Sequence, residues 1–172
     1  MNYYILFVQT QNQDVLVSLL EREGLKAYSP KFEYYRRDID VLALKALFPG
    51  YVFVESNLDQ VSFYSLIQNM EVKMGLIKEL RYKGTSALTK EEIAVLKRLL
   101  DDKGILRMSY GHLENKKLVI DSGPLVGFED YVTKVDRHNR LLWLDLYFFE
   151  NQQWKSGITV SEYKCQLKNV QF

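Results

Sequence analysis

The sequence is short of the residues from which disulfides and metal centres are built. Its 172 residues include one cysteine, Cys165, and two histidines, His112 and His138. A single cysteine excludes an internal disulfide and a CxxC pair, and neither histidine has a cysteine or carboxylate at ligand spacing. We therefore expect no metal site and no cofactor, and a reducing compartment.

Signatures of catalysis are also scarce. The stretch GPLVG at residues 123–127 lacks the GKS or GKT ending of a phosphate-binding loop, and Cys165 has no neighbouring base to activate its thiol. The acidic pairs in residues 38–40 and 101–102 lie in polar, loop-like stretches, where solvated surface is the simplest interpretation. We predict that the protein is not an enzyme, with a metal-dependent nuclease as the contrasting alternative.

Long apolar runs and an excess of charge are missing as well. The chain starts with a short apolar run before Gln9 and no basic leader, which predicts neither a signal peptide nor a membrane span and favours the cytoplasm. With 23 Lys+Arg against 22 Asp+Glu, the net charge is +1, so any contact with nucleic acid must come from a local patch. An apolar fraction of 47% is ordinary for a globular protein of one domain or two small ones.

Alternating strand and helix patterns fill the first hundred residues and predict an α+β domain over residues 1–102. Strands are expected at residues 3–8, 25–28, 31–37, 41–48, 51–55 and 72–77, and helices at 11–23, 57–69 and 89–100. The start of the third helix is marked by Thr89 and Glu92, which have the spacing of a capping box.

The stretch FPGYVFVE, residues 48–55, combines a rigid turn with large aromatic residues. Proline fixes its own φ and glycine accepts positive φ, so Pro49 and Gly50 predict a tight corner between two strands. Such a corner can hold the rings of Phe48 and Tyr51 toward a partner, although burial in the core is the serious alternative.

Beyond residue 102 the pattern changes. Residues 103–115 are polar and contain Gly104 and Gly111 with no sustained period, which predicts a linker. Residues 116–172 show only strand signals, at 118–120, 131–136, 140–148 and 158–160, with turns at 122–124 and 137–139. They predict a small all-β barrel followed by a C-terminal tail.

Three motifs, in this order and spacing, resemble the NusG family of transcription factors. They are Tyr3-Tyr4 in the first strand, FPGYVFV at residues 48–54 and GPLVGFEDYVTKVD at residues 123–136. The resemblance covers nearly the whole chain and implies an NGN domain, a mostly antiparallel sheet with helices, followed by a KOW barrel. The stretch KVDRHNR, residues 134–140, is most similar to the LoaP-type antitermination paralogs. Tyr3 stands where many relatives have tryptophan.

The resemblance implies that the NGN domain binds the clamp helices of the largest subunit of bacterial RNA polymerase and suppresses pausing and termination, in LoaP-type paralogs at selected operons. Carried over by position, the polymerase-binding residues are Tyr3, Phe48, Tyr51 and Phe53. No covalent chemistry is involved. The alternative is a KOW-containing RNA- or ribosome-associated protein that does not act on the polymerase.

Basic residues gather in the β-rich part and form a candidate site for nascent leader RNA. They are Lys116, Lys117, Lys134, Arg137, His138 and Arg140. The arginines could contact phosphate or guanine edges, and His138 could reach loop bases, while a merely solvated turn is the alternative.

An apolar stretch follows these basic residues, and its two faces differ in their expected role. Leu142, Leu144, Leu146 and Phe148 share one face, whereas Leu141, Trp143 and Tyr147 share the other, which suggests a partner there. The family resemblance implies a contact of Phe148 with a ribosomal protein. However, Phe148 lies an even number of residues from Leu142 and so on the same strand face, which favours burial of its ring in the core.

Overall fold

The computed structural model describes residues 1–161 except 72–74, 83–84, 87, 147 and 150–151. Within it the chain forms two compact units that alternate along the sequence, and each is described by itself. The first consists of Met1–Lys31, Ala46–Ile105 and Tyr147–Gln152, and the second of Phe32–Lys45, Leu106–Leu146 and the residues from Gln153 on. Cys165 and the tail from residue 162 lie outside the described residues.

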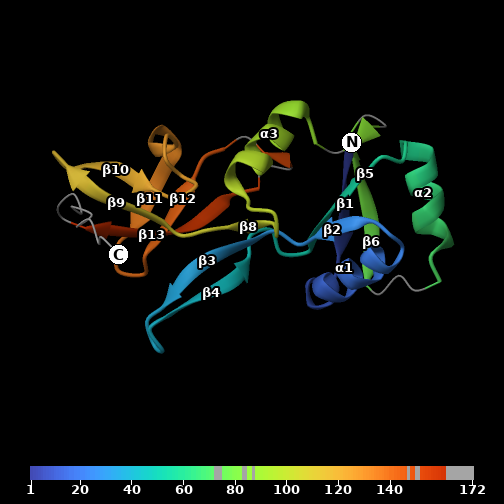
Figure 1. The fold of residues 1–172 in the computed structure, drawn as a ribbon, viewed down its shortest axis with the longest axis horizontal. Coiled ribbons are helices and arrows are strands. Elements are labelled where there is room, and N and C mark those ends of the chain that lie inside the picture. The colour runs from blue at the N-terminus through green and yellow to red at the C-terminus, as the bar shows by residue number, and fades with distance from the viewer. Residues whose placement is uncertain (72–74, 83–84, 87, 147, 150–151, 162–172) are drawn as a thin grey trace, which may run out of the picture. The chain divides into compact units, whose positions relative to one another are not determined.

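The first unit is built on a five-stranded sheet with the order β2-β5-β1-β6-β7 (Figure 1). Its strands are β1 (Asn2–Val8), β2 (Lys26–Tyr28), β5 (Tyr51–Ser56), β6 (Leu76–Tyr82) and β7 (Thr85–Ser86). All neighbouring pairs are antiparallel. The expected strand at residues 72–77 is represented by the start of β6, since 72–74 lie outside the described residues.

Alternation along β1 divides the side chains of this sheet between two faces. Tyr4, Leu6 and Val8 point to one face, and Tyr3 and Ile5 to the other. The helices α1 (Gln13–Arg22) and α2 (Gln60–Asn69) cover the first face, where Tyr4 stacks on Phe63 with ring centroids 3.8 Å apart. The core on that side consists of Tyr4, Leu6, Val8, Leu16, Leu20, Leu25, Ala27, Val52, Val54, Phe63, Ile67 and Met70.

The third helix, α3 (Lys90–Leu99), begins where the sequence predicts. The hydroxyl of Thr89 accepts the Glu92 N–H at 3.2 Å, and the Glu92 carboxylate accepts the Thr89 N–H at 2.7 Å. This reciprocal pair satisfies two backbone donors at the helix start and confirms the predicted capping box. Leu96 and Leu99 are buried.

The second unit contains a five-stranded sheet with the order β10-β9-β13-β12-β11. Its strands are β9 (Ser109–Glu114), β10 (Lys117–Ser122), β11 (Val132–Asp136), β12 (Leu141–Leu144) and β13 (Trp154–Ser161). The pair β13/β9 is parallel and the other pairs are antiparallel. Leu142, Leu144, Trp154 and Ile158 are buried in this unit.

A smaller sheet has the order β4-β3-β8 and belongs mostly to the second unit. Its strands are β3 (Lys31–Arg36), β4 (Val41–Ala46) and β8 (Ile105–Leu106). Two short 3-10 helices, η1 (Thr10–Asn12) and η2 (Glu129–Tyr131), complete the described elements. The α+β class predicted from the sequence is confirmed by this mixture of helices and antiparallel strands.

Residues 103–115 differ from the expected linker, because they contain β8 and the whole of β9. Gly111 explains why the sequence pattern indicated a linker. A Cβ at this position would collide with the carbonyl oxygen of Val119 on β10, so glycine permits close pairing of the two strands rather than a flexible connection. The predicted strand 140–148 also differs, since β12 ends at Leu144.

Membrane-spanning and metal-binding features are absent from the residues that the structure describes. No helix there is long and apolar enough to cross a membrane. No group of three or more histidine, cysteine or acidic side chains there could hold a metal ion.

Candidate functional site

The corner between residues 48 and 51 is a hydrogen-bonded turn. The Tyr51 N–H donates to the Phe48 carbonyl at 3.2 Å, and Gly50 has φ of 87°. Proline followed by a residue of positive φ is the arrangement of a type II turn. A Cβ at Gly50 would lie 3.0 Å from a ring carbon of Phe7, so glycine serves both the backbone angle and the packing. The tight corner predicted from the sequence is present.

A buried amide holds this corner in place. Nε2 of Gln13, the first residue of α1, donates to the carbonyl oxygens of Phe48 at 3.2 Å and Tyr51 at 2.9 Å. It also lies 2.7 Å from the hydroxyl of Ser29. Because unpaired carbonyls are costly in a buried site, these bonds fix the turn against the helix.

Aromatic rings pack around the corner on the sheet face opposite α1 and α2. In the antiparallel register Tyr51 lies across from Phe7 and Phe53 across from Ile5, so their side chains share the face of Tyr3. All four residues proposed from the sequence as polymerase-binding therefore belong to one region of the first unit. Phe48 and Phe53 have ring centroids 6.0 Å apart.

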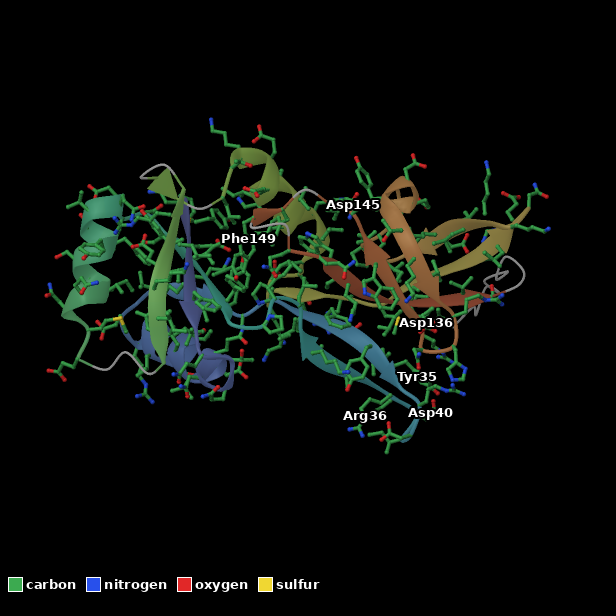
Figure 2. All side chains as sticks on the ribbon, turned by 180° about the vertical axis from the view of Figure 1, so that it is seen from behind. Tyr35, Arg36, Asp40, Asp136, Asp145 and Phe149 are labelled. Atoms are coloured by element: carbon green, nitrogen blue, oxygen red, sulfur yellow. The ribbon has the colours of Figure 1, made fainter. Side chains whose placement is uncertain are left out.

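Two rings from a distant part of the chain complete this cluster. Phe148 stacks on Phe48 at 5.2 Å, and Phe149 meets Phe48, Tyr51 and Phe53 at 5.6, 5.0 and 5.6 Å. Phe149 is labelled in Figure 2. The exposed fractions of Phe48 and Phe53 are 0%, whereas Tyr51 is half-buried. The expectation that the corner holds both flanking rings outward therefore differs from the structure for Phe48.

Tyr3, which is 2% exposed, lines a cavity of about 290 Å³ between the sheet and α3. Tyr28, Leu96 and Leu100 supply further apolar surface, and burial raises the pKa of Tyr28 well above its usual range. Lys97 Nζ lies 5.5 Å from the centroid of the Tyr3 ring. The remaining lining residues are Lys26, Glu55, Lys97, Asp101, Asp102 and Gly104.

Four of the six sequence-proposed RNA-binding residues lie on the hairpin of β11 and β12. Lys134 is on β11, Arg137 and His138 are exposed in the turn, and Arg140 precedes β12 with φ of 53°. The Asp136 carboxylate accepts the backbone N–H of Asn139 at 2.9 Å and its amide at 2.7 Å. These bonds order the turn and lower the pKa of Asp136.

Lys116 and Lys117 lie elsewhere in the second unit, at the turn between β9 and β10. Lys116 has φ of 65°, as part of that turn. In the sheet order β10 is at the opposite end from β11, so the two lysines are not on the hairpin that carries Arg137 and Arg140.

The sequence reasoning missed a second contributor to the basic region, the hairpin of β3 and β4. The Arg140 guanidinium lies 3.8 Å from the ring centroid of Tyr35, and Arg37 Nη1 lies 3.0 Å from Nδ1 of His138. The Tyr35 hydroxyl donates to Asp40, a bond that raises the pKa of Tyr35. Tyr35, Asp40 and Asp136 are labelled in Figure 2. The stretch YYRR at residues 34–37 contains a signal for this contribution, since surfaces that bind single-stranded nucleic acid combine aromatic and basic residues.

Comparison with known families gives the class of this protein, a transcription factor. Residues 1–97 match the family described as NusG, transcription termination factor nusG. Because the match covers more than half of the 172 residues, the chain belongs to the NusG family. None of the curated proteins compared with the chain matches it.

Proposed function

We propose that the protein is a processive transcription elongation and antitermination factor. It binds bacterial RNA polymerase through an NGN domain, residues 1–102, and suppresses pausing and termination at selected operons. The second unit, which contains β9 as well as the KOW domain predicted from residue 116 on, contacts nascent leader RNA, as the LoaP-like stretch at residues 134–140 suggests.

The single observation that carries this proposal is the aromatic face of the first unit, in a chain that belongs to the NusG family. Tyr3, Tyr51 and Phe53 share this face, and a cavity of about 290 Å³ lies next to it under α3. Tyr3 and Tyr28 line this concavity. Rigid aromatic side chains suit the docking of a helix, which supports the clamp helices of the largest polymerase subunit as the partner.

Tyr51 is the most accessible anchor on this face. Phe148 and Phe149 cover Phe48 and Phe53, so a polymerase helix that reached those two rings would displace this segment. Tyr51 is half-buried, and its backbone is fixed by the turn and by Gln13. A pre-ordered ring loses little entropy on binding, which favours it as the first contact.

RNA contact is supported by the basic side chains of the second unit. Lys134, Arg137, His138 and Arg140 lie on one hairpin, and Lys116 and Lys117 at a separate turn extend the proposed site. A ribosomal-protein contact of Phe148 is not favoured, because this ring is 1% exposed in the aromatic cluster.

The experiment is a pull-down of the purified protein with core RNA polymerase. Tyr51→Ala should weaken binding about thirtyfold, since truncation of an interface anchor typically costs about 2 kcal/mol. Tyr64→Ala is the matched control, because Tyr64 is a 46% exposed tyrosine on α2, on the opposite face of the sheet.

Equal polymerase binding by wild type and by folded Tyr51→Ala would remove this ring from the proposed surface. Failure of the wild-type protein to bind polymerase would remove the proposal altogether. The alternative, an RNA- or ribosome-associated protein that does not act on polymerase, would then be favoured by retained RNA binding.

A further inference from the structure

A cross-strand row of Lys134, Trp143 and Lys155 lies on the sheet of the second unit. In the register, Lys134 of β11 is opposite Trp143 of β12, and Trp143 is opposite Lys155 of β13. The two ammonium groups lie 4.7 and 5.1 Å from the centroid of the Trp143 ring. The indole is thus flanked by cations from both neighbouring strands.

This row is on the outer face of the sheet. Leu142 and Leu144 are buried, so alternation along β12 directs Trp143 to the opposite side. Lys134 is exposed, and Trp143 and Lys155 are half-buried. The ring is therefore partly exposed, and pairing on both sides fixes the strand that carries it.

The same face continues toward the basic residues of the β11–β12 and β3–β4 hairpins. Gly157 is opposite Leu141, the next outward position of β12, and a Cβ at Gly157 would collide with the carbonyl of Glu33 on β3. Strand β3 therefore passes over this face beside the Trp143 row. Its continuation carries Tyr35, whose ring receives the guanidinium of Arg140.

A purely structural role explains this arrangement poorly. One exposed cation over an aromatic ring stabilises a protein modestly, but a second cation at the same ring adds electrostatic repulsion. Among the described residues neither Lys134 nor Lys155 forms an ion pair with a carboxylate. Anions from outside the protein would satisfy both ammonium groups.

We propose that Trp143 is a stacking site for an unpaired base of single-stranded nucleic acid, with Lys134 and Lys155 on the phosphates that flank this base. This inference rests on the proposed RNA contact and names its chemistry. An indole stacks on any base, and neighbouring lysines neutralise the backbone, which is how sequence-tolerant single-strand sites work. A duplex does not fit the site, because its bases are paired and stacked on one another.

Tryptophan fluorescence of the full-length protein tests the stacking. The chain has two tryptophans, and Trp154 is fully buried, so quenching by a ligand reports on Trp143. The probes are an unstructured 12-residue oligoribonucleotide, its duplex with the complementary strand, and heparin as an anion without bases. The single strand should quench the emission, whereas the duplex and heparin should not.

Substitutions then measure the contribution of each group. Trp143→Leu should lower the affinity for the single strand roughly tenfold or more, and Trp143→Phe should retain most of it, because phenylalanine still stacks. Lys134→Gln with Lys155→Gln should make the salt dependence shallower. Lys103→Gln, an exposed lysine of the first unit, is the control that should change neither quantity.

Equal affinity of wild type and folded Trp143→Leu would overturn the stacking site, as would equal quenching by heparin and by the single strand. If Arg140→Ala alone weakened RNA binding, the proposed RNA contact would stand without this site. If the wild-type protein bound no RNA at low salt, both proposals on RNA would fail, independently of the polymerase test with Tyr51→Ala.

Discussion

The ring of Phe149 meets the ring of Tyr51 edge-on, with centroids 5.0 Å apart and an interplanar angle of 73°. This geometry places the positive edge of one ring against the negative face of the other, which is a favoured arrangement of aromatic pairs. Phe149 follows β12 in sequence and yet completes the core of the first unit, where it is 7% exposed.

Phe149→Ala should therefore destabilise the protein as a core substitution does. We expect a loss of about 3–5 kcal/mol in the free energy of unfolding, because the ring contacts Phe48, Tyr51 and Phe53 and leaves a cavity when removed. Urea denaturation followed by circular dichroism measures this loss. Phe128→Ala, at a half-buried phenylalanine, should cost less. Equal losses in the two variants would show that the aromatic cluster does not persist in solution.

The sequence predicted the local features of the first unit better than the long-range ones. The turn at Pro49-Gly50 and the capping box at Thr89 depend on residues that are adjacent or three apart, so their signals are complete in the sequence. The covering of Phe48 by Phe148 depends on residues a hundred positions apart, and neither strand nor helix periodicity carries that information.

The basic site of the second unit shows the same limit. The β11–β12 turn was predicted because the polar stretch at residues 137–139 interrupts two apolar runs. The approach of Tyr35 to Arg140 joins two hairpins that are far apart in sequence, and therefore no local pattern could reveal it. Gly111 misled the domain assignment because a glycine in a close strand pair looks like a glycine in a linker.

Gln13→Ala tests the bonds that fix the aromatic corner. It removes the side-chain amide that bonds the carbonyls of Phe48 and Tyr51, although the Phe48 carbonyl still accepts the Tyr51 N–H. The loss of these buried bonds should cost about 1–3 kcal/mol of unfolding free energy. Gln11→Ala, at an exposed position two residues earlier, should change stability by less than about 0.5 kcal/mol. Urea denaturation of both variants provides the comparison. A loss at Gln13 no larger than that at Gln11 would contradict the anchoring role.

Limited proteolysis distinguishes a strand from a linker at residues 109–114. Exposed linkers are preferred sites of cleavage, whereas paired strands resist it. Because β9 pairs with both β10 and β13, we expect no early cut within Ser109–Glu114 of the native protein. Gly111→Ala should make this segment susceptible, since the added Cβ would collide with the Val119 carbonyl. Rapid cleavage of the wild-type protein in β9 would restore the linker interpretation.

The order of the β11–β12 turn should depend on pH through Asp136. Hydrogen bonds from Asn139 lower the pKa of Asp136 in the folded turn, so the ionised carboxylate stabilises the turn above the ordinary aspartate pKa. This contribution is lost as the pH falls through the lowered pKa. An NMR titration should find the Asp136 carboxyl titrating below the ordinary range of aspartate, with the Asn139 amide signal shifting in step. In Asp136→Asn this transition of the Asn139 signal should disappear.

Arg37→Ala tests whether the β3–β4 hairpin takes part in RNA binding. Arg37 lies against His138, so the charge of Arg37 would also attract a phosphate bound near Arg137 and Arg140. With about three to five phosphate contacts, the affinity of the wild-type protein for a leader RNA should fall with salt at a log-log slope of roughly −2 to −4. Arg37→Ala and Arg140→Ala should each make this slope shallower by about 0.7–0.9.

The controls for this titration separate charge from geometry. Arg37→Lys retains the charge and should restore the slope, and Lys103→Ala in the first unit should leave it unchanged. A scrambled RNA of the same length shows whether bases are read, because pure phosphate contacts weaken all RNAs alike when an arginine is lost. If Arg37→Ala matched the wild-type affinity and slope while Arg140→Ala did not, the RNA site would be confined to the β11–β12 hairpin, and Arg37 would only support His138.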